Sequence, residues 1–288
     1  MRTSRGEVHA MVGGSGPPVL LLHGYPQSSM MWRDAATLLA KRCTVVATDL
    51  AGYGRSFRPA PTADHRAHDK RTMGGDQLET MQALGFDRFS VAGHDRGGRV
   101  AYRMALDHPA HVARLAVLDI VPTAEVYRLN GTLFGRFYWH WSFLAQPAPL
   151  PERLIGGDRD AFFDLHVRAG MGLGATEGRY PAEIMLGYRQ ALDDPGLVEG
   201  MCEDYRAGAG ADREADEADA AAGARIDCPV LVLWAGRGSL PRVYPDVLEV
   251  WRAWARNVRG EPIDAAHFLV EDQPEQVAAR LASFVAGP

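Results

Sequence analysis

Five short apolar runs constrain the fold of this chain more than any other feature. They cover residues 19–22, 44–48, 89–92, 115–118 and 230–234. Each is closely followed by a glycine, aspartate or histidine and then by a helix-forming stretch. Strands that are apolar on both faces are typical of parallel sheets covered by helices on both sides. We therefore predict an α/β fold with a mostly parallel sheet.

The alternation of strands and helices stops between about residues 122 and 225, where aromatic and helix-forming segments replace the apolar runs. The strand pattern resumes at Cys228-Pro229. We therefore predict a core domain formed by residues 1–122 and 226–288, with a helical cap domain of residues 123–225 inserted into it. With 288 residues, 47% of them hydrophobic, the chain is long enough to bury one sizeable core.

Charge and cysteine content narrow the class of protein. A net charge of -5 carries no general electrostatic signature of nucleic-acid binding, so we expect no nucleic-acid partner. The three cysteines, Cys43, Cys202 and Cys228, are far apart and form neither a disulfide framework nor a zinc-site spacing. The N-terminal segment lacks an apolar signal core, and no apolar run approaches the ~18 residues that cross a bilayer. We expect a cytoplasmic protein with no membrane association.

The sequence GHDRGG at residues 93–98 lies between the third apolar run and the helix-forming stretch 100–106. Glycines permit a tight strand-to-helix turn that exposes one side chain above the sheet, and here that side chain is Asp95. A carboxylate nucleophile can displace a leaving group from saturated carbon and form an alkyl ester. The turn therefore favours dehalogenation or epoxide opening over esterase chemistry. The alternative is that Asp95 only caps the following helix.

Other positions complete a hydrolase set around this turn. Asp119 follows the run 115–118 and His267 lies near the C-terminus, in the chain order nucleophile, acid, histidine. Tyr25 follows the first apolar run, where its backbone N–H can form an oxyanion hole with that of Arg96. No carboxylate occurs in residues 235–239, directly after the last apolar run. We therefore place the catalytic acid at Asp119.

Two arginines follow the candidate nucleophile. Arg96 and Arg99 are three residues apart at the start of a helix, so their side chains can converge on one face near Asp95. Cations are disfavoured at a helix N-terminus, so the pair requires anions. Asp95 supplies one, and a substrate carboxylate held by guanidinium N–H groups would supply another. The alternative is a pair of surface arginines in exposed ion pairs.

At this point the chain resembles the fluoroacetate/haloacetate dehalogenases of the α/β-hydrolase fold. The resemblance covers nearly the whole chain. GHD alone is shared with epoxide hydrolases and haloalkane dehalogenases, whereas the arginine pair combined with the cap motifs is more specific. The motifs that carry the resemblance are HGYPQ (23–27), GHDRGGR (93–99), DIVPT (119–123), WHW (139–141), CEDYRA (202–207) and HFLVE (267–271).

The resemblance implies that Asp95 is the nucleophile, that His267 and Asp119 activate water, and that Arg96 and Arg99 hold the substrate carboxylate. It also implies a halide site in the cap, made of His140, Trp141 and Tyr205. An imidazole, an indole and a phenol can all donate hydrogen bonds to a halide without adding another full charge. The competing interpretation is an ordinary aromatic face at residues 134–143 that packs the cap onto the core.

The chain departs from the family pattern at two places. Ala266 stands where the family has a glycine before the catalytic histidine. Residues 168–174 read RAGMGLG, whereas fluoroacetate-active members carry a pocket tryptophan in the matching segment. This second departure predicts a wider pocket.

We predict hydrolytic dehalogenation of a short 2-haloacid, such as haloacetate to glycolate and halide. The expected partner is the small-molecule haloacid, and no metal, flavin or nicotinamide is required. The resemblance implies a homodimer. An epoxide hydrolase that uses Asp95 with Tyr138 and Tyr205 as ring-opening acids remains open, as does a ligand-binding protein of the same fold without turnover.

Overall fold

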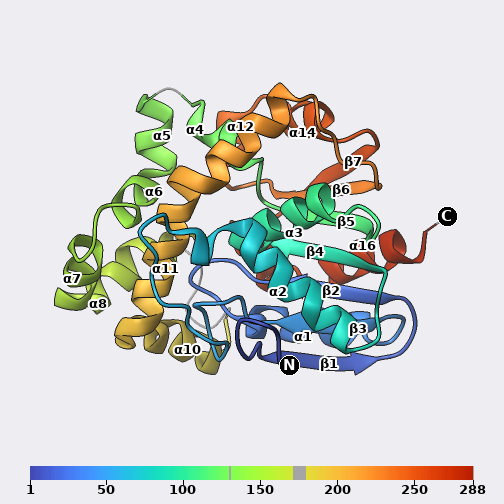
Figure 1. Cartoon of the computed structure of the whole chain (residues 1–288), viewed down its shortest axis with the longest axis horizontal. Helices are drawn as coiled ribbons and strands as arrows, with labels where there is room; N and C mark the ends of the chain where they lie inside the picture. Colours follow the sequence, from blue (N-terminus) through green and yellow to red (C-terminus); the bar gives the residue numbers. More distant parts are fainter. Residues whose placement is uncertain (130, 171–179, 288) are drawn as a thin grey trace.

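The computed structural model describes residues 1–129, 131–170 and 180–287. Its strands form a single sheet in the order β1-β3-β2-β4-β5-β6-β7 (Figure 1). β1 pairs antiparallel with β3, and the other neighbouring strands are parallel. The strands are β1 (Ala10–Gly14), β2 (Pro18–Leu22), β3 (Thr44–Thr48), β4 (Phe89–His94), β5 (Val112–Leu118), β6 (Val230–Ala235) and β7 (Val258–Ile263).

Helices cover both faces of the sheet. The side chains of β2 alternate between two hydrophobic clusters, so Leu20 and Leu22 join one and Val19 and Leu21 join the other. Residues of α2, α3 and α14 belong to the first cluster, and residues of α1, α15 and α16 to the second. This alternation explains why the central strands contain almost no polar residues. The helices of the sheet domain are η1 (Ser29–Trp32), α1 (Arg33–Leu39), η2 (Arg66–His68), α2 (Lys70–Ala83), α3 (Asp95–Asp107), α13 (Leu240–Val243), α14 (Val247–Trp254), α15 (Leu269–Asp272) and α16 (Pro274–Ala286).

Between β5 and β6 the described chain contains helices and no strand. In Figure 1 these helices gather at one side of the sheet, with α11 running along the junction. The predicted α/β fold with an inserted helical cap is therefore confirmed. The cap helices are α4 (Thr123–Tyr127), α5 (Gly131–Phe137), α6 (Trp139–Leu144), α7 (Leu150–Gly157), α8 (Arg159–Phe162), η3 (Phe163–Val167), α9 (Arg168–Gly170), α10 (Ala182–Asp193), α11 (Pro195–Ala207), η4 (Gly208–Asp212) and α12 (Arg213–Ala221).

The five predicted apolar runs correspond to β2, β3, β4, β5 and β6, and the two edge strands were missed. β7 has the sequence VRGEPI, and four of its six residues are charged, glycine or proline. β1 is only partly buried, and it ends in two glycines. An edge strand pairs on one side only, so it needs neither a continuous apolar sequence nor a full set of backbone donors.

Within the described ranges, no helix is long and apolar enough to cross a membrane. The 14-residue helix α2 falls short of the ~20 residues that a bilayer requires.

Candidate active site

Asp95 occupies a strained turn at the point where β4 ends and α3 begins. Its φ is 46°, in the left-handed region that L-residues rarely adopt. The backbone folds back closely on itself in this turn, so that a Cβ on Gly93 would lie 2.3 Å from the carbonyl oxygen of Gly97. Only glycine fits at such an approach. The predicted strand-to-helix turn is thus present, and Asp95 lines a cavity above the sheet.

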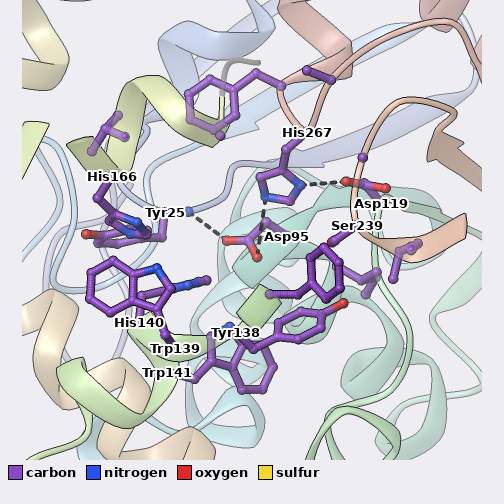
Figure 2. A pocket seen from close by; sticks show the side chains of 18 of the residues that line it. Tyr25, Asp95, Asp119, Tyr138, Trp139, His140, Trp141, His166, Ser239 and His267 are labelled. Carbon is purple, nitrogen blue, oxygen red and sulfur yellow. Dashed lines mark hydrogen bonds and ion pairs between the residues drawn. The ribbon is translucent and has the colours of Figure 1, made fainter. Parts of the chain in front are cut away.

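The carboxylate of Asp95 is held from two sides (Figure 2). Its Oδ1 accepts a 3.0 Å hydrogen bond from the backbone N–H of Tyr25, and its Oδ2 lies 3.9 Å from Nε2 of His267. Burial alone would raise the pKa of Asp95, but the charges of His267 and of nearby Arg96 and Arg99 outweigh it and lower the pKa to about 2. Asp95 is therefore an ionised carboxylate at neutral pH.

His267 is oriented by Asp119, which directly follows β5. Nδ1 of His267 lies 2.6 Å from Oδ2 of Asp119, and Oδ1 of Asp119 accepts a 2.9 Å hydrogen bond from the N–H of Ala235. Burial alone would lower the pKa of His267, but the hydrogen bond and charge of Asp119, with the charge of Asp95, raise it. The arrangement matches the order nucleophile, histidine, acid that activates water in hydrolases.

The turn after β6 offers no second candidate for the predicted acid. It contains no carboxylate, and its Ala235 N–H instead fixes the Asp119 side chain. Asp119 itself has a φ of 53°, so two strained residues, Asp95 and Asp119, stand at the ends of neighbouring parallel strands. Strain of this kind is concentrated at functional sites.

Arg96 and Arg99 take different positions. Arg99 lines the cavity, where Nη1 donates to the carbonyl of Val121 at 3.1 Å and to Oγ1 of Thr123 at 3.0 Å. Arg96 is fully buried and is not among the described residues that line the cavity. Its Nε and Nη2 donate to the carboxylate of Asp204 at 3.0 and 2.5 Å. The sequence analysis did not anticipate Asp204 as the anion that pairs with Arg96.

Asp204 joins the cap to the core because it belongs to α11, whereas Arg96 belongs to α3 of the sheet domain. It also accepts hydrogen bonds from Tyr53 and from Lys70, and all these groups are buried. Burial would raise the pKa of Asp204, but Arg96 and Lys70 hold it well below its usual range. One N–H group of Arg96, at Nη1, and one of Arg99, at Nε, have no hydrogen-bond partner within the described structure.

The structure brings the three predicted halide ligands together on the wall of the same cavity. His140 and Trp141 come from α6 and Tyr205 from α11, with ring centroids 5.8 Å apart for His140–Tyr205 and 6.0 Å for Trp141–Tyr205. Burial holds the pKa of His140 well below its usual range and that of Tyr205 well above. All three side chains are therefore neutral at physiological pH and carry N–H or O–H groups.

Trp141 and Tyr205 also belong to the hydrophobic cluster that packs the cap onto the core. The competing interpretation, an aromatic face that packs the cap onto the core, is therefore correct for the apolar surfaces of these two rings. Among the described hydrogen bonds, however, none uses the polar atom of either ring, and both rings line the cavity. Within the described residues, these donors therefore have no hydrogen-bond partner on the cavity wall.

His166 is a cavity residue that sequence reasoning missed. It lies in the π-helical turn η3, a feature that is frequent at functional sites, with its ring centroid 4.7 Å from His140 and 5.1 Å from Trp139 (Figure 2). Burial lowers the pKa of His166 to about 4, so this imidazole is neutral as well. A single histidine between two helical stretches offers no pattern by which it could have been found.

The two departures from the family pattern have different outcomes. Ala266 lines the cavity, and its N–H donates a 2.9 Å hydrogen bond to Oδ2 of Asp272. The backbone directly before His267 is therefore hydrogen-bonded with alanine in place of glycine. Of the segment 168–174, residues 171–174 lie outside the described residues. The wider pocket expected from the missing tryptophan remains a prediction.

The cavity has a volume of about 580 Å³ and lies between the sheet domain and the cap. No group of three metal-ligating side chains occurs in the part of the chain that the structure describes. The cavity is lined by Tyr25, Pro26, Asp95, Arg99, Asp119, Ile120, Arg136, Phe137, Tyr138, Trp139, His140, Trp141, His166, Val167, Gly170, Tyr205, Arg237, Gly238, Ser239, Leu240, Arg242, Ala266, His267 and Phe268.

Comparison with known proteins identifies the family. The sequence pattern of the α/β-hydrolase fold matches residues 17–274, which is most of the chain. The chain belongs to the α/β-hydrolase fold family. The α/β-hydrolase architecture predicted from the sequence is thereby confirmed.

Relatives within the α/β-hydrolase family include enzymes with different reactions. The chain is 43% identical to a fluoroacetate dehalogenase from Burkholderia sp., over 96% of this chain and 90% of that protein. It is 30% identical to a soluble epoxide hydrolase from Corynebacterium sp. (strain C12), over 97% and 93%. A solved structure from Nostoc sp. PCC 7120, assigned to the α/β hydrolases, superposes with a TM-score of 0.95 at 42% identity, covering 100% of this chain and 97% of that one.

Proposed function

We propose that the protein hydrolyses the carbon–halogen bond of short 2-haloacids through an alkyl ester on Asp95. The observation that carries this proposal is the composition of one cavity. It holds an ionised carboxylate, a histidine–aspartate pair that can activate water, an arginine, and three neutral donors with no hydrogen-bond partner among the described residues. The 43% identity to a fluoroacetate dehalogenase supports the same reaction.

In the first step, an oxygen of Asp95 attacks the carbon that bears the halogen, from the side opposite the leaving group. The new C–O bond forms as the carbon–halogen bond breaks, and the halide leaves with the bonding electron pair. Arg99, supported by Nη1 of Arg96, holds the substrate carboxylate and so aligns the carbon with Asp95. His140, Trp141 and Tyr205 donate hydrogen bonds to the departing halide.

In the second step, His267 removes a proton from water, and the resulting hydroxide attacks the carbonyl carbon of the Asp95 ester. The negative oxygen is stabilised by the backbone N–H groups of Tyr25 and Arg96. The Tyr25 N–H already lies 3.0 Å from an oxygen of Asp95, and Arg96 is in the first turn of α3, where N–H groups lack helical acceptors. The C–O bond to the hydroxyacid then breaks, and the departing alkoxide takes the proton from His267. Asp95 keeps one oxygen of the water, and its carboxyl group releases the remaining proton to solvent to become a carboxylate again.

An epoxide hydrolase is the second candidate because Tyr138 and Tyr205 both line the cavity. Such an enzyme needs an acid that protonates the opened ring. A neutral epoxide, however, would leave the buried Arg99 guanidinium, which lines the cavity and has no ion pair in the described structure, without an anionic partner. This arginine therefore favours a carboxylate substrate.

Initial halide release from fluoroacetate, chloroacetate and 2-chloropropionate, beside diol formation from a simple epoxide, tests the proposal. We expect release from all three acids, with chloroacetate at least as fast as fluoroacetate because fluoride is the poorer leaving group. Diol formation without halide release would establish the epoxide hydrolase instead. Binding of the acids with neither reaction would establish a ligand-binding protein.

The organisation of the protein belongs to the same proposal. We place the sheet domain at residues 1–122 and 226–288 and the cap domain at residues 123–225. All three cysteines are free, which supports a cytoplasmic location. We also propose a homodimer, which sedimentation equilibrium would distinguish from a monomer.

A further inference from the structure

The opening of the cavity carries three arginines that the reaction at Asp95 does not use. Arg136, Arg237 and Arg242 line the cavity and are exposed to solvent. Arg136 comes from α5 of the cap, whereas Arg237 and Arg242 come from the turn after β6 and from α13 of the sheet domain. The cavity mouth, defined here as these three residues, is therefore positive on both of its sides.

This positive charge is opposite in sign to that of the chain as a whole, which is -5. Among the described residues that line the cavity, the only acidic ones are Asp95 and Asp119, and both are buried. Asp119 is bound to His267 and to Ala235, so it is not available to the mouth arginines. The cavity thus presents a positive mouth to an incoming ligand.

Two of the mouth arginines have no protein partner in the described structure. Arg237 forms an ion pair with Asp264. No described ion pair or hydrogen bond uses the side chain of Arg136 or Arg242, and the guanidinium of Arg136 lies 5.5 Å from the ring centroid of Phe137. A free guanidinium offers a planar set of N–H donors that matches a carboxylate.

The size of the cavity also favours a ligand longer than a haloacetate. A volume of about 580 Å³ lies within the range of about 300–1,000 Å³ that accommodates drug-sized ligands, and a haloacetate is far smaller. Arg99, supported by Arg96, holds the carboxylate next to the reacting carbon at the buried end of the cavity. The space between that end and the mouth is left for a longer molecule.

We propose that the cavity mouth binds a second carboxylate, so that the substrates used best are 2-halo dicarboxylic acids. This inference rests on the proposed function. One carboxylate of the substrate lies at Arg99, the halogen-bearing carbon lies at Asp95, and the far carboxylate lies between Arg136 and Arg242. A diacid would bridge the cap and the sheet domain, because its two partners at the mouth belong to different domains.

A different role for the same charges is electrostatic steering. Charges at the rim of a site raise the rate of encounter with any anion, whatever the rest of its structure. Steering would therefore raise the association rate of monoacids as well as diacids, by a smaller factor for the singly charged monoacids. Binding of a second carboxylate would instead depend on the presence of that group at the far end of the substrate.

The test compares 2-chlorosuccinate with 2-chlorobutyrate, which have the same number of carbons and differ in the terminal group. The variant is Arg136→Gln/Arg242→Gln. The control is Arg42→Gln/Arg153→Gln, which removes the same charge from two exposed arginines outside the cavity lining. We expect the KM of the diacid to rise about ten-fold in the variant, a factor that two exposed ion pairs can supply, and that of the monoacid to change less than about two-fold.

An equal rise in KM for both acids, or no rise for the diacid, would overturn the proposal. Binding of the unreactive succinate and butyrate, measured by calorimetry, separates this inference from the proposed function because it requires no turnover. We expect the native protein to bind succinate more tightly than butyrate and the variant to lose the difference. If the native protein releases no chloride from any acid, the proposed reaction fails, while the succinate measurement still decides whether the mouth binds a second carboxylate.

Discussion

Replacing Arg99 by methionine should remove the anchor of the substrate carboxylate and leave most of the cavity wall in place. Methionine has a similar length and can pack against Trp141, whose ring centroid lies 4.4 Å from the Arg99 guanidinium. Truncating one partner of a buried charge pair costs about 2–5 kcal/mol. At about 1.4 kcal/mol for each factor of ten, kcat/KM for chloroacetate should fall by about 30-fold to several thousand-fold.

The same substitution also removes two structural hydrogen bonds, to Val121 and Thr123, so stability must be measured separately. Leaving buried acceptors unpaired costs about 1–3 kcal/mol, which urea denaturation would detect. Arg103→Met is the matched control, because Arg103 is a buried arginine of the same helix that pairs with Asp219 and does not line the cavity. It should reduce stability without affecting substrate choice.

The decisive assay compares chloroacetate with chloroacetamide, a neutral analogue with the same reacting carbon. In Arg99→Met, activity on the amide should change only a few-fold while activity on the acid collapses. In Arg103→Met, the ratio of the two activities should equal that of the native enzyme. Equal losses on acid and amide in Arg99→Met would refute the assignment and show that Arg99 serves the structure instead.

Two further predictions follow from the buried charges. In a single turnover, the rate of ester hydrolysis should rise with pH and level off above the raised pKa of His267, because only the neutral imidazole accepts a proton from water. Asp119→Asn removes the charge that raises this pKa, so the rise in rate should occur at lower pH. Pre-steady-state rates measured across the pH range test both expectations. Asp204→Asn should lower the free energy of unfolding by about 3–5 kcal/mol, since it leaves buried Arg96 and Lys70 without their shared counter-ion, and urea denaturation would measure the loss.

The central part of the fold could be predicted from the sequence because burial on both faces leaves a clear pattern. Strands such as β2 and β6 contain only apolar residues between their flanking turns. The edge strands lacked that pattern, because β7 tolerates charged residues, glycine and proline on its half-exposed faces. Their pairing depends on the neighbouring strand rather than on their own composition.

Local sequence could single out Asp95 and Asp119 as candidates because each closely follows an apolar run, and His267 by its place near the C-terminus in the chain order nucleophile, acid, histidine. The partners of Arg96 could not be found in this way. Asp204 is 108 residues away in the sequence, and only the tertiary fold brings its carboxylate to the Arg96 guanidinium. His166 was missed for the same reason. It lies beside His140 only in the folded protein, and no sequence motif surrounds it.

The covalent ester on Asp95 is the central claim, and intact-protein mass spectrometry of His267→Asn tests it most directly. Without the base, the first step should proceed and the second should stop. Incubation with chloroacetate should therefore increase the protein mass by one carboxymethyl group, and peptide mapping should locate the group at Asp95. The double variant Asp95→Asn/His267→Asn should gain nothing. A mass increase located at another residue, or no increase in a folded His267→Asn protein that still binds chloroacetate, would contradict the mechanism.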